Sequence, residues 1–246
     1  MLSSLKQHQE QIERNRRIWL TKPLLREIYR AFYEKILALV DDRLPGRIVE
    51  IGSGAGNLKT HCPQALGTDL FENPWLDLVC DGYELPFRMG SLSHLVLFDV
   101  FHHLQAPNAF LREARRVLQP QGRLILFEPF VSWGSHLVYG VCHPEPVAWR
   151  QSIDLSAQPP VLRSYHAAQG NATRLFFRRE VPDWPAEWKV FHAECIVSFS
   201  YLLSGGFSRP ALYPAALLPL VRRMDRCFSS FPGIFGTRCL VAMSPV

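Results

Sequence analysis

Arg47-Ile48-Val49-Glu50-Ile51-Gly52-Ser53-Gly54-Ala55-Gly56-Asn57-Leu58 is the stretch of sequence that decides the fold of this chain. It begins with apolar, β-branched residues after Leu44-Pro45-Gly46, which predicts a buried strand. Glycines then stand at every second position. Glycines that directly follow a strand let the backbone approach a ligand more closely than any Cβ would permit. The stretch therefore predicts a ligand-binding loop at the end of a strand.

The spacing of these glycines separates classes of cofactor. A dinucleotide fingerprint requires G-x-G-x-x-G, whose third glycine opens a helix that faces a pyrophosphate. Here Asn57 stands at that position and the third glycine, Gly56, comes one residue early. The Gly-Lys-Ser/Thr ending of a P-loop is also absent from this stretch. The spacing therefore disfavours a nicotinamide oxidoreductase and excludes a P-loop.

The run Glu50-x-Gly52-x-Gly54-x-Gly56 resembles the first motif of class I S-adenosylmethionine-dependent methyltransferases. That resemblance implies that S-adenosylmethionine is the cofactor and that the glycines pass under its methionine and ribose parts. It implies a cofactor-binding role for Glu50, Gly52, Ser53, Gly54 and Gly56.

Acidic residues follow the next two predicted strands. The strand over 65–68 ends at Asp69, and a strand over 76–80 ends at Asp81. The resemblance implies that Asp69 accepts hydrogen bonds from both ribose hydroxyls, that Leu70 packs on the adenine ring, and that Asp81 reaches the adenine amine. A charge-assisted pair of this kind is stronger than a neutral one. The structural alternative is a helix N-cap for Asp69 and a capping role in a loop for Asp81.

The connection between these two strands departs from the common family pattern. Parallel neighbours usually need a crossover of about a dozen residues or more, and the family places a full helix here. Only six residues are available. Either 71–75 crosses as a tight loop, or the strand boundaries differ from those predicted.

A fourth strand is predicted over 94–98, with His94 where the family usually has Asp. It ends at Asp99 and is followed by His102 and His103, similar to the histidine pair of the type 11 methyltransferase-like branch. A helix from Pro107 then leads into "EARRVLQPQGRLILFEP", which contains a fifth strand and matches the family closely. The resemblance covers roughly residues 45–130.

The chemistry of methyl transfer limits what side chains must do. The cofactor already activates the electrophile, so the protein supplies alignment, a dry site and, where the acceptor must lose a proton, a base. His102 and His103, and less so Glu128, are the candidate bases, because a neutral imidazole titrates near the working pH. The alternative is that the histidines only shape the pocket. Asp99 is expected to position the methionine end of the cofactor.

The sequence as a whole predicts an α/β fold. We expect a doubly wound, seven-stranded, mostly parallel sheet of the Rossmann-like methyltransferase type, with an antiparallel last strand, N-terminal helices and an inserted cap. Helices are predicted over 4–20 and 24–41, a sixth strand near 188–199 and the last strand over 237–243. The expected divisions are a helical extension (1–44), the S-adenosylmethionine-binding core (45–130), a cap or lid (131–187) and completing C-terminal elements (188–246).

Composition sets further limits. The chain has 246 residues, a formal charge of +5 and six cysteines without C-x-x-C spacing, so neither a zinc site nor a disulfide framework is indicated. A reducing, cytoplasmic location is expected, because the N-terminal residues do not resemble a signal peptide. No run approaches the ~18 apolar residues of a spanning helix.

The expected acceptor is a small molecule with hydrophobic character, lipid-like molecules included. The Asn/Asp-Pro-Pro-aromatic motif and the cysteine-proline pair of nucleic-acid methyltransferases are missing after the fourth strand, so nucleic acid is disfavoured. Two other functions remain open, a catalytically inactive cofactor-binding module and, less well supported, a nicotinamide oxidoreductase. The oligomeric state is not indicated.

Overall fold

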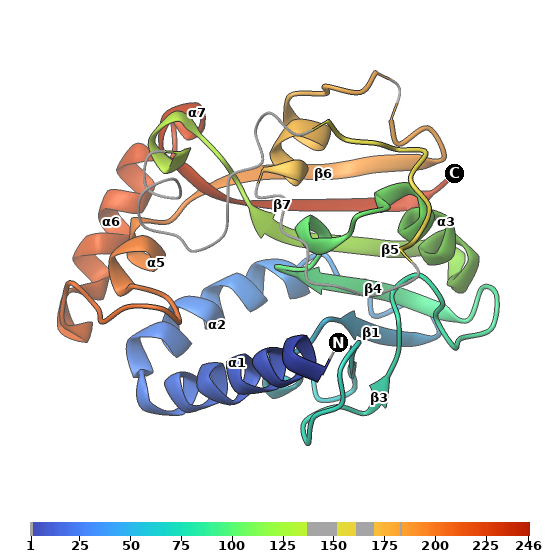
Figure 1. Ribbon diagram of the computed structural model, residues 1–246. Coiled ribbons are helices and arrows are strands. Elements are labelled where there is room, and N and C mark those ends of the chain that lie inside the picture. Colours follow the sequence, from blue (N-terminus) through green and yellow to red (C-terminus); the bar gives the residue numbers. More distant parts are fainter. Residues whose placement is uncertain (1, 137–151, 161–169, 183) are drawn as a thin grey trace.

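A seven-stranded sheet forms the centre of the computed structural model, which describes residues 2–136, 152–160, 170–182 and 184–246 (Figure 1). Its order is β3-β2-β1-β4-β5-β7-β6, and β7 runs antiparallel to both of its neighbours. This confirms the predicted sheet with an antiparallel last strand. The strands are β1 (Arg47–Ile51), β2 (Leu66–Asp69), β3 (Leu78–Val79), β4 (Leu92–Phe98), β5 (Leu118–Pro129), β6 (Trp188–Val197) and β7 (Gly236–Pro245).

Both predicted N-terminal helices are present, although the second ends at Leu37 rather than at 41. The helix predicted from Pro107 is also confirmed, with the proline in its first turn. Proline costs no hydrogen bond there, because the first N–H groups of a helix have no acceptor within it. The α-helices are α1 (Leu2–Thr21), α2 (Pro23–Leu37), α3 (Pro107–Val117), α5 (Phe199–Ser204), α6 (Leu218–Phe228) and α7 (Pro232–Phe235). Shorter helical turns are η1 (Leu58–Thr60), η2 (Phe101–His103), η3 (Thr173–Phe177, a π-helix) and η4 (Ala215–Leu217).

The two faces of the sheet are covered by different helices. Val49 and Leu95 belong to a core cluster with the buried face of α3, whereas Ile48 and Val96 belong to a second cluster with α2. This follows from the period of two in a strand, which sends neighbouring side chains to opposite faces. Figure 1 shows α5, α6 and α7 together, beyond the end of the sheet toward which β4 and β5 point. The doubly wound arrangement is thereby confirmed.

The connection from β2 to β3 is the tight loop that the sequence left open as one alternative. Residues 70–77 contain no helix, and β3 has two residues rather than the five expected. The carboxylate of Asp77 folds the loop back by accepting a hydrogen bond from the Gly67 N–H (2.9 Å). The Asp77 N–H donates to the Gly67 carbonyl (2.9 Å) in turn. A side chain therefore replaces the crossover helix at this edge.

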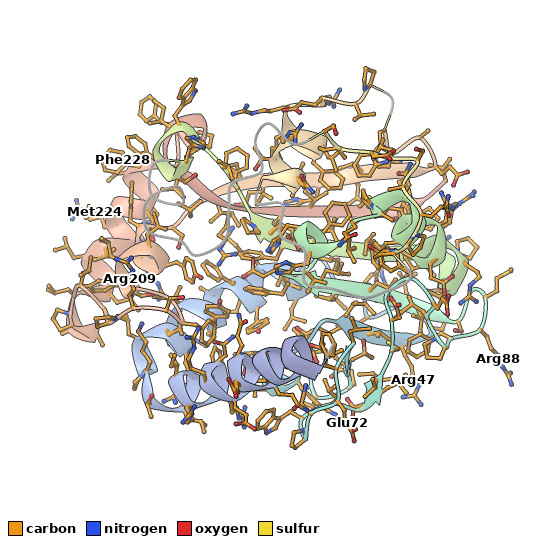
Figure 2. All side chains as sticks on the ribbon, viewed as in Figure 1. Arg47, Glu72, Arg88, Arg209, Met224 and Phe228 are labelled. Atoms are coloured by element: carbon orange, nitrogen blue, oxygen red, sulfur yellow. The ribbon has the colours of Figure 1, made fainter. Side chains whose placement is uncertain are left out.

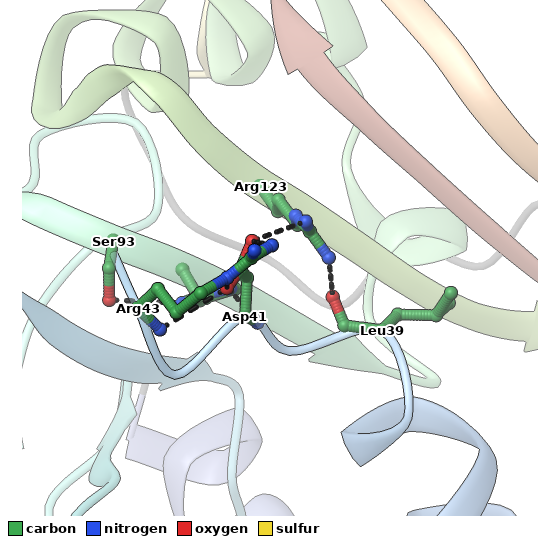
Figure 3. A network of polar contacts seen from close by, with 6 residues as sticks. Leu39, Asp41, Arg43, Ser93 and Arg123 are labelled. Carbon is green, nitrogen blue, oxygen red and sulfur yellow. Dashed lines mark hydrogen bonds and ion pairs between the residues drawn. The ribbon is translucent and has the colours of Figure 1, made fainter. Parts of the chain in front are cut away.

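A polar network fixes the segment between α2 and β1 against the sheet (Figure 3). Asp41 accepts hydrogen bonds from Arg43 and from Arg123 of β5, and Arg123 also donates to the Leu39 carbonyl (2.7 Å). His94, on β4, accepts the Asp41 N–H at Nε2 (3.0 Å). Burial, together with the nearby Arg123 charge, lowers the pKa of His94 to about 4, so the acceptor form is the stable one. His94, which stands where the family usually has Asp, thus helps to fix the segment before β1 to the sheet.

Of the predicted cap over 131–187, residues 137–151, 161–169 and 183 lie outside the described residues. Within its described part, η3 packs Leu175 into the α3-side core with Phe130, and the Thr173 hydroxyl accepts the Val131 N–H (2.9 Å). Among the described helices, none is long and apolar enough to cross a membrane. The described residues also contain no group of three or more side chains placed to hold a metal ion.

Candidate functional site

A cavity of about 520 Å³ lies at the carboxyl ends of the parallel strands, where open α/β sheets bind ligands. It is walled by the glycine loop after β1, the ends of β2 and β4, η2, both N-terminal helices and the loop after α5. Its lining includes eight of the nine predicted cofactor residues and both predicted catalytic histidines: Glu50, Gly52, Ser53, Gly54, Asp69, Leu70, Asp81, Asp99, His102 and His103.

The glycine loop takes its shape from left-handed backbone conformations. Gly52, Gly54 and Gly56 have φ values of 69°, 51° and 69°, which side-chain-bearing residues rarely adopt. A Cβ on Gly52 would come within 2.5 Å of a Val100 methyl group, so that glycine permits close packing. A Cβ on Gly54 would meet no atom within 4 Å. Gly54 therefore faces open space, while Gly56 does not line the cavity and serves the turn by donating to the Ser53 carbonyl (2.9 Å).

Asp69 connects the end of β2 to the glycine loop. Its Oδ2 accepts the Gly54 N–H at 2.9 Å, and its Oδ1 accepts the Phe71 N–H at 3.3 Å. Asp81 makes a similar local bond, accepting the Tyr83 N–H at 3.0 Å. No helix follows Asp69 directly, so the alternative that it caps a helix is wrong. The bond from Tyr83 agrees with the alternative that Asp81 caps a loop. Each stabilises a turn, and a carboxylate keeps further acceptor capacity after one or two such bonds.

Glu50 is an acid buried at the end of β1, with 4% of its surface exposed. Burial, reinforced by the negative charge of Asp69, raises the pKa of Glu50 well above its ordinary value. Burial opposes the charged form of a carboxyl group, and a neighbouring negative charge opposes it further. This end of the cavity therefore favours a ligand that brings positive charge or hydrogen-bond donors.

Asp99 follows β4 in a left-handed conformation, with φ 57°. Its N–H donates to the Phe127 carbonyl (2.9 Å), and its carboxylate is ion-paired with Arg238 of β7. Burial raises the pKa of Asp99, and the Arg238 charge acts against that rise. The guanidinium carbon of Arg238 also lies 4.4 Å from the centre of the Tyr201 ring, a cation–π distance. Asp99 is thus held in one position from two sides.

Arg238 was missed from the sequence. Its side chain is only 3% exposed, and it stands in an otherwise apolar strand. Arginine is almost never fully buried unless it is paired, so its place in the run TRCLVAM was the available signal. What the sequence could not show is that β7 would carry it to the end of β4.

His102 is buried and oriented by Glu128. The imidazole Nδ1 lies 2.6 Å from Oε2 of Glu128, which is itself fully buried. Oε1 of Glu128 accepts the N–H groups of Val100 (2.9 Å) and Phe101 (2.8 Å). Burial alone would raise the pKa of Glu128, but the His102 charge and these hydrogen bonds outweigh it and lower the pKa. Glu128 does not line the cavity, and its contacts hold η2 and His102.

Aromatic side chains form a second wall that the sequence did not assign to the site. Tyr29 and Tyr33 reach the cavity from α2, and the Tyr29 ring stacks on Phe98 with centroids 5.1 Å apart. Burial raises the pKa of both tyrosines well above the ordinary value, so they stay neutral. Helical spacing in the sequence places Ile28, Phe32 and Ile36 on one apolar face of α2, and the two tyrosines stand beside that face. Periodicity alone does not tell a core face from a cavity wall.

The helix α1 closes the cavity over the glycine loop. Its basic residues favour a solvated face, and Arg14 and Arg17 are indeed exposed, but Arg14 also lines the cavity. Arg16 is half-buried, lies over the Trp75 ring at 5.4 Å and donates to the Ala55 carbonyl at 3.5 Å. The helix thus contributes to the site through contacts with the glycine loop and with the distant loop between β2 and β3.

Comparison with known proteins agrees with this geometry. Residues 49–126 match the family model described as methyltransferase domain. A Mus musculus protein named probable tRNA methyltransferase 9B is 28% identical over 122 residues. That alignment covers 44% of this chain and 27% of the mouse protein, so the chain spans only about a quarter of that relative.

Solved structures share the fold over almost the whole chain. One belongs to a complex between the Haloferax volcanii Trm112 methyltransferase activator and a methyltransferase, with a TM-score of 0.54, 18% identity, and 96% of this chain and 94% of that chain covered. Another is a Thermotoga maritima SAM-dependent methyltransferase, with a TM-score of 0.54, 16% identity, and 97% and 98% covered.

Proposed function

We propose that this protein, whose residues 49–126 match the methyltransferase-domain family, moves the methyl group of S-adenosylmethionine to a small, partly hydrophobic acceptor. One observation carries the proposal. A single cavity of about 520 Å³ collects the glycine loop and four carboxyl side chains from the ends of separate strands and loops. These are Glu50, Asp69, Asp81 and Asp99.

The residues of the cavity fit the cofactor. The open space at Gly54 accepts a ligand where a Cβ would stand, and Asp69 is bonded to that same loop. We assign Asp69 to the ribose hydroxyls, Leu70 and Asp81 to the adenine, and Asp99 to the methionine end. The same carboxyl groups would repel a pyrophosphate beside the glycine loop, which argues against a nicotinamide cofactor.

The acceptor is assigned to the part of the cavity beside η2 and the aromatic wall. When bound, S-adenosylmethionine supplies a methyl group on a positively charged sulfur, ready for in-line displacement by the acceptor. Tyr29, Phe98 and Tyr201 exclude water from this part and favour an acceptor with hydrophobic character.

His102 is the better placed of the two candidate bases. The Glu128 carboxylate holds Nδ1 of His102, and we assign Nε2 of the same ring the role of proton acceptor. A base oriented by a third group in this way can take a proton from an acceptor hydroxyl or amine. The His103 ring packs on the His102 ring, with the two centroids 3.9 Å apart, and we assign His103 to the wall of the acceptor site.

The test is cofactor binding by matched glycine variants, measured by calorimetry with S-adenosylmethionine and with NAD. Gly54→Val fills the open space in the cavity. Gly90→Val is the control, because Gly90 has a similar φ of 64° and an equally open Cβ position remote from the cavity. Both variants should be strained to a similar extent by ~1–2 kcal/mol. Gly54→Val alone should lose S-adenosylmethionine binding. Retained binding in a folded Gly54→Val protein would place the cofactor elsewhere.

The acceptor class is tested by methyl transfer from labelled cofactor into a cell extract. Label in an organic-solvent fraction supports the hydrophobic acceptor. Label in RNA would refute it in favour of a nucleic-acid acceptor, the class named for the mouse relative. Cofactor binding without any transfer would support the inactive binding module instead.

A further inference from the structure

Exposed apolar side chains form a continuous stripe along α6. The α6 stripe consists of Leu217, Leu220, Met224, Phe228 and Phe231. Leu220, Met224 and Phe228 are spaced by four residues and share one face of α6, while Leu217 directly precedes the helix and Phe231 follows its end. All five are at least 36% exposed. The buried side of α6 is formed by other residues, Leu218 and Val221. The helix is therefore apolar on two sides. On the exposed side, Phe228 packs on the rings of Phe199 (5.5 Å between centroids) and Phe235 (4.8 Å) and still keeps 36% of its surface exposed.

The stripe continues into two neighbouring segments. The Ile234 N–H donates to the Phe231 carbonyl (3.1 Å), and the Ile234 carbonyl accepts the Ser132 hydroxyl (2.8 Å). This second bond places Trp133, which is 81% exposed, beside the stripe, and Ile234 is itself exposed. Large apolar side chains this exposed in one contiguous area mark an interaction surface more often than a plain solvent face.

The charges around the stripe are positive. Arg223 and Arg226 are exposed on α6. The acid of the helix, Asp225, turns inward and accepts the Ser200 hydroxyl at 2.6 Å. It is the only acidic residue between 211 and 235 in the sequence. Arg222 is engaged inward with the Glu27 carbonyl (2.9 Å), so Arg223 and Arg226 are the charged side chains that α6 exposes beside the stripe.

We propose that the α6 stripe docks on an anionic lipid surface, with the apolar side chains entering the acyl boundary and Arg223 and Arg226 facing the headgroups. An amphipathic helix with a basic rim and a tryptophan at its edge has the composition of such interfacial elements. Folding does not account for this face, and the charge pattern selects anionic lipid over neutral lipid. The inference concerns a separate surface and does not rest on methyl transfer.

The surface lies next to the rim of the cavity. Residues 205–209, which line the cavity, are separated from Leu217 by residues 210–216 in the chain, and Lys22 holds them by donating to the carbonyls of Gly206 (2.7 Å) and Arg209 (2.9 Å). Figure 2 shows Arg209 on the same side of the molecule as Met224 and Phe228. Docking would bring the rim of the cavity close to the lipid, where a hydrophobic acceptor would concentrate.

The experiment is co-flotation of the full chain with vesicles of phosphatidylcholine, with and without about one-third phosphatidylserine. The wild-type protein should float with the anionic vesicles, and binding should weaken in high salt. The double variant Leu220→Asp/Met224→Asp should lose at least about tenfold in binding. Arg223→Gln/Arg226→Gln should lose roughly fivefold per arginine on anionic vesicles and little on neutral ones.

Matched controls come from another part of the surface. Met89 (78% exposed) and Arg88 lie far from the stripe, and Figure 2 shows Arg88 on the opposite side of the molecule. Met89→Asp and Arg88→Gln should bind vesicles as the wild type does. No flotation of the wild type, or equal flotation of the stripe and control variants, overturns the proposal. So does dimerisation that the Leu220→Asp/Met224→Asp variant abolishes in the absence of vesicle binding, because the occupant is then a second copy.

Discussion

Replacing Glu128 by Gln tests whether the segment after β4 is held in place from within the sheet. The carboxylate accepts four hydrogen bonds, two at Oε1 from Val100 and Phe101 and two at Oε2 from the N–H and Nδ1 of His102. A glutamine keeps an acceptor for the first pair. It turns an NH₂ group toward the second pair, so the His102 N–H loses its acceptor and the imidazole loses its charged partner.

The expected cost follows from this geometry. Breaking a buried charged pair by changing one partner costs ~3–5 kcal/mol, and the two bonds retained at Oε1 place this variant toward the lower end. We expect the free energy of unfolding to fall by ~2–4 kcal/mol in urea titrations near pH 7. Turnover should fall as well, because His102 loses the group that orients it.

Glu113→Gln is the matched control. Glu113 accepts a hydrogen bond from the Leu85 N–H (2.6 Å) and forms an ion pair with Arg116. Unlike Glu128, it is only half-buried, and it does not line the cavity. Its loss of charge should cost at most about 1 kcal/mol, as for a partly exposed pair, and should leave turnover unchanged.

The pH dependence supplies the decisive measurement. Since the pKa of Glu128 is lowered by folding, its carboxylate stabilises the protein above the ordinary pKa of 4.5, and this contribution is lost as the pH falls through the folded value. The difference in unfolding free energy between wild type and Glu128→Gln should therefore shrink in acid. A loss below ~1 kcal/mol at pH 7, or a difference that does not vary with pH, would refute the role assigned to Glu128.

Three further predictions concern the site and its support. Asp69→Asn should weaken S-adenosylmethionine binding by ~1.5–3 kcal/mol in calorimetry. The control Asp77→Asn alters a similar turn away from the cavity and should leave binding unchanged; equal effects of the two variants would mean that Asp69 acts only through the loop. His102→Gln should lower turnover ~10²–10⁴-fold, keep cofactor affinity, and remove a limb of the pH–rate profile near the imidazole pKa. His103→Gln should have a smaller effect, and turnover within a few-fold of the wild type in both variants would make the histidines structural. Folding lowers the pKa of His94 from 6.5 to about 4, so the unfolded chain takes up the proton at a higher pH than the folded chain does. The free energy of unfolding should therefore drop by about 3 kcal/mol as the pH falls from 6.5 to 4. His94→Gln should flatten this decline, and an unchanged decline in the variant would contradict the prediction.

The order and type of most elements could be predicted because the signals are local. The β-branched run before the glycines, the amphipathic stripe of α3 and the last apolar strand each carry their own periodicity, and the structure has all three. The glycine loop and the acids at the strand ends were found for the same reason, since each follows a recognisable strand. The missing crossover helix could be stated as an alternative from the count of residues alone.

What the sequence could not supply are contacts between distant segments. Arg238 holds Asp99 across 139 positions, and Glu128 orients His102 across 26, so no window of local sequence contains either pair. The α6 stripe shows the same limit in reverse. Its spacing is that of an ordinary core-facing helix, and only the packing of α6 shows that this face is left outside.

The sequence by itself therefore determined the sheet, the position of the ligand-binding edge and the kind of side chain that reaches it. These depend on strand and helix periods and on the conformational freedom of glycine, which are properties of neighbouring residues. The tertiary structure alone decided which carboxylates are held and by what, which walls are aromatic and which apolar face meets solvent. Burial and pairing set those properties, and both arise only when separate elements of the chain pack together.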